Sequence, residues 1–220
     1  MKQVLQNLKT GKIGVENVPQ PILRDEGILV RTRVSLISAG TERMMLQLGQ
    51  KSLVGKARER PDLVKRVLDK VKRDGFWATF HAVREQLDRE TPLGYSLCGE
   101  VLQAGALASE YTPGSLVACA GAGHANHAEI NYVPKMLTVR VPAGVLPEQA
   151  AYATVGAIAL QGIRNADVRV GEVVVVIGLG LIGQLAVQQL RAAGCRVIGL
   201  DMSPDRVELA EANGAELALA

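Results

Sequence analysis

The chain has few aromatic residues, few cysteines and no long apolar run. Only 2 Phe, 4 Tyr and 1 Trp occur among 220 residues, which argues against an aromatic platform that stacks single-stranded nucleic acid. The 3 cysteines, Cys98, Cys119 and Cys195, form no close pair and favour a reducing cytoplasm over a disulfide framework. Apolar stretches end well before the roughly 18 to 20 residues that a membrane span needs. The sequence therefore predicts a cytoplasmic protein without a membrane or nucleic-acid partner.

The formal net charge is small, at +3, but 9 basic and 4 acidic residues lie between positions 51 and 74. A basic segment of this kind could meet phosphates on a nucleotide, a nucleic acid or a membrane surface. Leu63, Val67 and Val71 recur within it at helical spacing, so we interpret the charges as the solvated face of an amphipathic helix. A second helix follows, and the pair predicts a helical insert at about residues 45–90.

A glycine-rich turn, Gly178 to Gly183, follows a β-branched run at residues 173–177 and precedes a helical stretch. Gly178 is expected to make a tight turn, Gly180 to let a pyrophosphate approach the backbone, and Gly183 to let helix and strand pack closely. Asp201 ends the next apolar run, 18 residues after Gly183, where a carboxylate accepts hydrogen bonds from the ribose hydroxyls of NAD. The pattern predicts the start of a Rossmann βαβ unit; the alternative is a strand, turn and helix without a ligand.

The carboxylate of Asp201 also predicts which dinucleotide is bound. It would accept a hydrogen bond from a ribose 2′-hydroxyl but repel a 2′-phosphate, so NAD is favoured over NADP. Arg206 lies nearby in the sequence and keeps NADP open as the alternative cofactor.

Short apolar segments separated by Gly and Pro turns make up most of the remaining chain. They predict an N-terminal hairpin and then strands at residues 28–37, 93–103, 115–120 and 127–133. A single helix is expected at residues 148–164, ahead of the glycine-rich turn. We therefore predict an α/β fold with two domains: a partly open β-barrel that carries the helical insert, at residues 1–147, and an incomplete Rossmann unit, at residues 148–220.

Four segments carry a resemblance to a known family: Ser38-Ala39-Gly40-Thr41-Glu42, Pro92-Leu93-Gly94-Tyr95-Ser96-Leu97-Cys98-Gly99-Glu100-Val101, the pair Pro113-Gly114, and the glycine-rich turn. Their order and spacing resemble the medium-chain dehydrogenase/reductase superfamily over nearly the whole chain. The resemblance implies a GroES-like catalytic domain followed by the start of the Rossmann NAD(P)-binding domain of a zinc-type alcohol dehydrogenase relative. More narrowly, residues 35–44 and the insert behind them are similar to bacterial bi-domain oxidoreductases.

The resemblance implies an enzyme that transfers hydride between NAD(H) and an alcohol or carbonyl substrate. The bi-domain likeness implies a carbohydrate-like substrate, while quinone or enoyl reduction, as in zinc-free relatives, stays open. A non-catalytic nucleotide-binding or assembly module of a larger bi-domain protein is the alternative function.

Three positions depart from the zinc-dependent members of the superfamily. Those members place zinc ligands where this chain has Ala39, Tyr95 and Thr154, and an alanine methyl cannot bind a metal. A second set, Cys119, His124 and His127, has the spacing Cys-x4-His-x2-His but no fourth ligand at a recognised spacing. We therefore predict no zinc and no other metal.

Without a metal, another group has to stabilise the substrate oxygen. Tyr95 replaces the histidine ligand, and its phenol is the first candidate to donate a proton or a hydrogen bond. Thr41 or Ser38 is expected to assist, and Glu42 to orient a partner. The alternatives are a boundary tyrosine that contacts water and, for Glu42, an ion pair with Arg43 or a neighbouring lysine.

The resemblance further implies which side chains surround the cofactor. Thr154 is expected near the nicotinamide. Leu179, Leu181 and Ile182 are expected to supply amides or apolar cover at the pyrophosphate turn, and Asp201, Met202 and Arg206 to surround the adenosine.

Only 19 residues follow Asp201, enough for a helix at residues 205–213, whereas a complete dinucleotide domain has about six parallel strands. The sequence predicts two of these strands. We therefore expect the fold to be completed by further sequence or by another chain, and an uncovered sheet to favour homo-oligomer formation.

Overall fold

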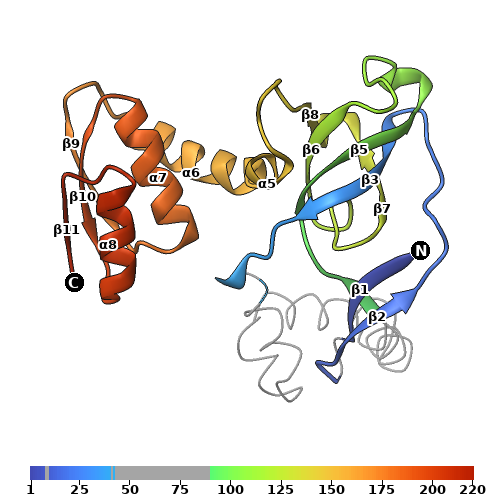
Figure 1. Cartoon of the computed structure of the whole chain (residues 1–220), viewed down its shortest axis with the longest axis horizontal. Helices are drawn as coiled ribbons and strands as arrows, with labels where there is room; N and C mark the ends of the chain where they lie inside the picture. Colours follow the sequence, from blue (N-terminus) through green and yellow to red (C-terminus); the bar gives the residue numbers. More distant parts are fainter. Residues whose placement is uncertain (8–9, 41, 43–89) are drawn as a thin grey trace, which may run out of the picture. The chain divides into compact units, whose positions relative to one another are not determined.

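The computed structural model describes residues 1–7, 10–40, 42 and 90–220. Thr41 and the helical insert predicted at residues 45–90 lie outside the described residues, apart from residue 90. The chain divides into two compact units, Met1–Pro147 and Glu148–Ala220 (Figure 1). Each unit is described by itself.

The first unit begins with an antiparallel hairpin, as predicted. Strand β1 (Lys2–Asn7) pairs with β2 (Ile13–Asn17), and β4 (Glu90–Pro92) adds to the other edge of β1 to give the order β2-β1-β4. The backbone amide of Val4 donates to the carbonyl oxygen of His127 at 2.9 Å. The loop before β7 is therefore fastened to the hairpin.

A five-stranded antiparallel sheet forms the body of this unit, in the order β7-β3-β5-β6-β8. Its strands are β3 (Gly27–Ser35), β5 (Ser96–Ala104), β6 (Leu116–Ala120), β7 (Ile130–Pro134) and β8 (Thr138–Arg140). Two irregularities in the β3–β5 register, at Leu29/Val30 and Thr32/Val34, increase the twist that curls the sheet. Short 3-10 helices, η1 (Ala106–Ala108) and η2 (Lys135–Leu137), fill its connections.

The concave side of the curled sheet is lined by β-branched and leucine side chains. Six of them are fully or almost fully buried: Ile28, Val30, Leu97, Val101, Val117 and Val133. Alternation along each strand sends these residues to one side, so that the core of the unit lies within the curl.

The second unit contains a three-stranded parallel sheet with helices beside it (Figure 1). Strands β9 (Val173–Ile177), β10 (Arg196–Leu200) and β11 (Leu217–Leu219) have the order β11-β10-β9. The helices are α6 (Ala153–Asn165), α7 (Leu181–Ala192) and α8 (Pro204–Ala212), and a one-turn helix α5 (Pro147–Ala150) precedes them. Leu179, Val187, Leu190 and Val197 pack in the core between sheet and helices.

The predicted α/β fold class, a β-rich domain followed by a Rossmann-type unit, is confirmed, but several elements differ from the prediction. Strands β4 and β8 were not predicted. The helix predicted at residues 148–164 is two helices, α5 and α6, separated by a turn. The strand predicted to begin at His127 begins at Ile130, because the side chain of Asn131 bonds the backbone of residues 126 and 128 and holds a turn there.

A parallel strand of the second unit was also not predicted. After α8 the chain returns to the sheet as β11, where Glu216 N–H donates to Val197 O at 2.8 Å and Asp201 N–H donates to Leu219 O at 3.1 Å. The segment is too short for its alternation to register in a sequence pattern, and its backbone bonds form only against β10.

One face of the parallel sheet remains exposed. Along β9, Val174 and Val176 pack toward the core, while Val173, Val175 and Ile177 are 52%, 51% and 82% exposed. Leu217 and Leu219 of β11 are 45% and 48% exposed. Across the part of the chain that the structure covers, no helix combines the length and the apolar character that crossing a bilayer requires.

Candidate functional site

The glycine-rich turn joins β9 to α7 in the second unit. Gly178 has φ +90°, a conformation that side chains with a Cβ rarely adopt. A Cβ added to Gly183 would collide with the carbonyl oxygen of Gly178, so glycine is required where α7 crosses the strand end. A Cβ at Gly180, by contrast, would meet no atom within 4 Å, which leaves the backbone there open to a ligand.

Asp201, after β10, closes this turn. Its Oδ2 accepts a hydrogen bond from Leu179 N–H at 2.7 Å, and its Oδ1 accepts one from Ser203 N–H at 2.9 Å. The Nη1 atom of Arg206 lies 3.5 Å from Oδ2. The backbone hydrogen bonds from Ser203 and Leu179, followed by the charge of Arg206, hold the pKa of Asp201 below its ordinary value. Asp201 is therefore a fixed negative charge beside the turn.

The first turn of α7 provides the positive counterpart. Gly180 is the residue before this helix, and no side chain caps it there. The leading N–H groups of an α-helix have no acceptor within the helix and carry its positive dipole end. An anion such as a pyrophosphate is stabilised at such an end.

The remaining predicted cofactor residues differ in exposure. Leu181, Thr154 and Arg206 are half-buried or exposed, Ile182 is 39% exposed and Met202 is 96% exposed. Leu179 is fully buried, and its N–H donates to Asp201, so it contributes to the turn from inside the protein. A pocket of about 640 Å³ includes Gly180, Leu181 and Arg206 in its lining.

Gln184 is a residue of this site that the sequence analysis missed. It is buried on α7, and its Nε2 donates to Leu179 O at 3.2 Å and to Arg206 O at 2.8 Å. Asn213 Nδ2 donates in turn to Gln184 Oε1 at 3.0 Å. Gln184 thus fastens the turn to α8. A glutamine directly after the third motif glycine was its only signal in the sequence.

In the first unit, Tyr95 is half-buried just before β5, and its carbonyl oxygen accepts a hydrogen bond from Gly121 N–H at 2.9 Å. Glu42 is buried, and its Oε1 accepts a hydrogen bond from Ser38 N–H at 3.1 Å. Its side-chain partner in the described chain is His127, whose Nε2 lies 3.1 Å from the same oxygen. The alternative partner, Arg43, and the predicted Thr41 lie outside the described residues.

The Cys-x4-His-x2-His segment is not arranged as a ligand set. Cys119 lies in the core of the sheet, where burial raises the pKa of its thiol to about 12. His127 bonds Glu42 and Ser35 instead. Among the residues that the structure describes, no three His, Cys, Asp or Glu side chains are grouped so as to hold a metal ion.

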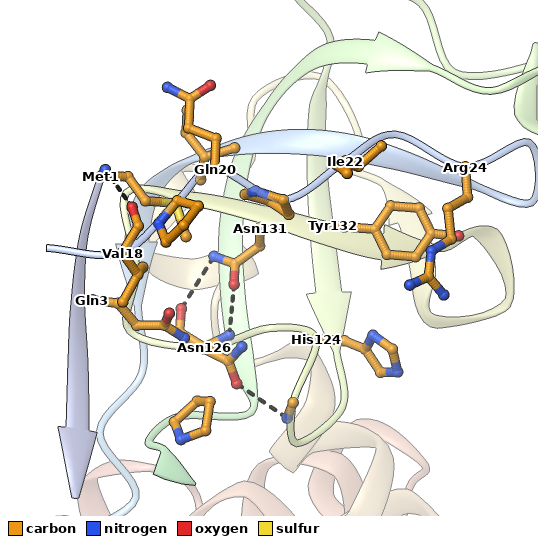
Figure 2. Close-up of a pocket in the computed structure, with 15 residues that line it drawn as sticks. Met1, Gln3, Val18, Gln20, Ile22, Arg24, His124, Asn126, Asn131 and Tyr132 are labelled. Carbon is orange, nitrogen blue, oxygen red and sulfur yellow. Dashed lines mark hydrogen bonds between the residues drawn. The ribbon is translucent and has the colours of Figure 1, made fainter. Parts of the chain in front are cut away.

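A pocket of about 520 Å³ opens beside the N-terminal hairpin (Figure 2). His124, Arg24 and Tyr132 are among its lining residues, with the Arg24 guanidinium 5.6 Å from the Tyr132 ring centroid. Asn126 and Asn131 bond one another at its floor (Figure 2). Neither Glu42 nor Tyr95, the two predicted catalytic residues that the structure describes, lines this pocket.

Comparison with known proteins finds named dehydrogenases among those similar to this chain. A family profile described as a TrkA-N domain matches residues 174–220. The chain is 34% identical over 128 residues to D-guloside 3-dehydrogenase of Shigella flexneri, which covers 58% of this chain and 36% of that protein. It is 32% identical over 94 residues to (R,R)-butanediol dehydrogenase of Bacillus subtilis, covering 42% of this chain and 27% of that protein.

Solved structures share the fold along almost the whole chain. Galactitol-1-phosphate dehydrogenase of Escherichia coli superposes with a TM-score of 0.74 at 19% identity, covering 99% of this chain and 60% of that one. Quinone oxidoreductase of Thermus thermophilus, whose complex with NADPH is known, superposes with a TM-score of 0.69 at 22% identity, covering 99% and 59%.

The chain therefore has the fold of an oxidoreductase with a dinucleotide-binding domain. Its homologues are zinc-type alcohol dehydrogenase-like members of the medium-chain dehydrogenase/reductase superfamily, so the resemblance inferred from the sequence is confirmed. The homologues are named dehydrogenases and oxidoreductases, as predicted. The chain spans about a third of the length of the curated guloside relative.

Proposed function

We propose that the protein is an oxidoreductase that transfers hydride between NAD(H) and an alcohol or carbonyl substrate without zinc. The observation that carries the proposal is the glycine-rich turn with Asp201 fixed beside it. The open backbone at Gly180, the uncapped first turn of α7 and the nearby carboxylate match the pyrophosphate and ribose of a dinucleotide.

NAD is favoured over NADP by the charge at Asp201. A carboxylate whose pKa is held low remains ionised at neutral pH and would repel a 2′-phosphate placed at the ribose. Arg206 Nη1, 3.5 Å from this carboxylate, offsets part of the charge but is engaged with it. When bound, the nicotinamide would accept or supply the hydride. Gly180 and Leu181 would hold the pyrophosphate, and Met202 and Thr154 would lie along the rest of the dinucleotide.

The absence of zinc is supported by donor chemistry. Ala39 has no donor atom, and Tyr95 and Thr154 are hydroxyl side chains, whereas zinc in proteins is bound by Cys, His and carboxylate groups. A hydrogen bond or proton from Tyr95, assisted by Thr41 and Glu42, would take over the stabilisation of the substrate oxygen. A cytoplasmic location stays a prediction.

The substrate class is a carbohydrate-like alcohol. The relative with the guloside activity is 34% identical over 128 residues, and a bi-domain oxidoreductase likeness points to the same chemistry. Quinone reduction is the competing activity, because structures with that name share the fold.

The test measures cofactor binding and turnover separately. NADH should raise the melting temperature and show enhanced nicotinamide fluorescence, as ligand binding to the native state requires. Asp201→Asn should weaken NADH binding and reduce the ratio of the affinity for NADH to the affinity for NADPH. Glu216→Gln, an exposed carboxylate on the sheet paired with Arg196, is the matched control and should change neither.

Each outcome of this test decides a different part of the proposal. Equal affinity of the native chain for both dinucleotides would remove the NAD preference, and no affinity for either would end the dehydrogenase proposal. Binding without oxidation of methyl β-D-guloside or reduction of a quinone would favour the non-catalytic module.

A further inference from the structure

Three side chains from separate parts of the first unit form a hydrogen-bonded chain. Ser35 is the last residue of β3, Glu42 follows seven positions later, and His127 lies in the loop before β7. His127 Nδ1 is 2.8 Å from Ser35 Oγ, and His127 Nε2 is 3.1 Å from Glu42 Oε1. We refer to Ser35, His127 and Glu42 as the triplet.

The hydrogen bonds of the triplet have a defined direction. A carboxylate oxygen can only accept, and Glu42 Oε1 already accepts from the N–H of Ser38. The bond from His127 Nε2 therefore needs a proton on Nε2. In a neutral imidazole this leaves Nδ1 without a proton, so Nδ1 accepts from the hydroxyl of Ser35. Hydroxyl, imidazole and carboxylate are thus arranged in the order that general-base catalysis uses.

The surroundings of the imidazole hold it in place. The side chains of His127 and Glu42 are 10% and 11% exposed, and His127 N–H donates to Leu93 O at 2.8 Å. A Cβ on Gly94, with φ +92°, would lie 2.7 Å from His127 N and 2.9 Å from Nδ1. The ring therefore packs directly on the backbone of Gly94, next to the proposed catalytic Tyr95.

We propose that the triplet is the acid–base relay of the active site: the hydroxyl of Ser35 exchanges the proton of the substrate oxygen, while Tyr95 contributes a hydrogen bond to the same oxygen. This inference rests on the proposed function. In alcohol oxidation a bound nicotinamide would take the hydride as the substrate C–H bond breaks. The substrate O–H proton passes to Ser35 Oγ while the Ser35 proton passes to His127 Nδ1. The products are a carbonyl and an imidazolium that the Glu42 carboxylate stabilises, and carbonyl reduction moves the same protons in reverse.

The relay would supply the acid–base function that zinc supports in zinc-dependent enzymes. Zinc would lower the pKa of a bound alcohol, and a chain without its ligands needs a base for that proton. His127 is the described imidazole that bonds both a carboxylate and a hydroxyl. Buried ionisable groups that bond one another are candidates for such a role, and purely structural networks share this feature. The experiment has to separate the two roles.

The first measurement needs no turnover. Long-range ¹H–¹⁵N spectra of the chain with ¹⁵N-labelled histidine show which ring nitrogen of His127 carries the proton, with His127→Gln used to assign the signal. The relay requires the neutral form to carry it on Nε2. A neutral form protonated on Nδ1 would overturn the relay, because Ser35 could not then pass its proton to the ring.

The second measurement uses NAD with methyl β-D-guloside as the probe. Ser35→Ala should lower kcat about 100-fold, the lower end of what general acid–base catalysis contributes, with the NADH dissociation constant unchanged within about twofold. Ser35→Thr keeps a hydroxyl and should recover much of the rate, which guards against a folding defect. His124→Gln, in the neighbouring loop but outside the triplet, is the matched control and should behave as the native chain.

The outcomes separate the relay from the dehydrogenase proposal. A native chain that binds no NADH removes the proposed function itself. A native chain that binds NADH and oxidises the probe, with Ser35→Ala equally fast, removes the relay and leaves the dehydrogenase. If the native chain binds NADH without oxidising the probe, the position of the proton on His127 decides: Nε2 supports the relay and Nδ1 overturns it.

Discussion

The two units build their sites in different ways. In the second unit the turn, the first amides of α7 and Asp201 all come from one stretch of about 25 residues, residues 178–203, and most of the contacts are made by the backbone. In the first unit Ser35 and Glu42 meet His127 across separations of 92 and 85 residues, through side chains alone. A local backbone site is visible as a sequence motif, whereas a site assembled by sheet topology is not.

The largest expected effect tests whether the two units are independent. Leu97 and Leu190 are buried in the cores of the first and second units, at 0% and 2% exposure. Truncating either to alanine should cost about 2–5 kcal/mol, from lost transfer free energy and a residual cavity. Hydrogen exchange followed by mass spectrometry should show that Leu97→Ala removes protection within residues 1–147 and that Leu190→Ala removes it within residues 148–220. Loss of protection across both units from either variant would show a single cooperative structure.

The next effect tests the close crossing at the glycine-rich turn. Gly183→Ala places a Cβ against the carbonyl oxygen of Gly178 and should destabilise the second unit by about 1–3 kcal/mol, as overpacking does. Thermal unfolding followed by circular dichroism measures it. Gly162→Ala on α6 is the matched control. The added Cβ meets no atom within 4 Å, so the variant should stabilise the second unit by roughly 0.5–1 kcal/mol, because alanine has the higher helix propensity. Equal changes in stability for the two variants would show that the contact with the Gly178 carbonyl oxygen does not destabilise the second unit.

These contrasts also explain how much the sequence could predict. The hairpin, the strands around Ile28, Leu97 and Val117, and the glycine-rich turn were found because alternation, turn glycines and apolar runs are local signals. The strand β11 was missed because its three residues pair only once β10 is in place.

The candidate site residues follow the same division between local and long-range signals. Asp201, a predicted cofactor residue, was proposed from its spacing to the motif, and in the structure its carboxylate accepts a hydrogen bond from the amide of Leu179 in that turn. His127 was considered only as a metal ligand, because its spacing to Cys119 suggested that, and its bonds to Ser35 and Glu42 depend on how β3, the chain after it and the loop before β7 meet in space. No local pattern contains that information.

A smaller effect concerns pH. The pKa of Asp201 is lowered in the folded chain, first by the Ser203 amide and then by that of Leu179. A carboxyl with a depressed folded pKa contributes stability that is present above its unfolded pKa and is lost as the pH falls below it, from about pH 4 downward. Asp201→Asn should therefore lower the stability of the second unit at pH 7 and flatten its decline in acid. Melting temperatures of both chains from pH 7 to pH 3 measure this, and parallel curves would contradict it.

The smallest change in stability is expected for a substitution on the exposed face of the parallel sheet. Val174 packs toward the core whereas Val175, its neighbour on β9, is 51% exposed. Val174→Thr buries a hydroxyl and should destabilise the second unit by roughly 1–3 kcal/mol, while Val175→Thr should change its stability by no more than about 0.5 kcal/mol.

An exposed apolar strand face favours association with a second copy of the chain, so Val175→Thr, and more strongly its combination with Ile177→Thr, should reduce concentration-dependent association in sedimentation velocity. If Val175→Thr destabilises as much as Val174→Thr, both faces of β9 are covered in solution, and the contrast between a closed curled sheet and a half-covered parallel one does not hold.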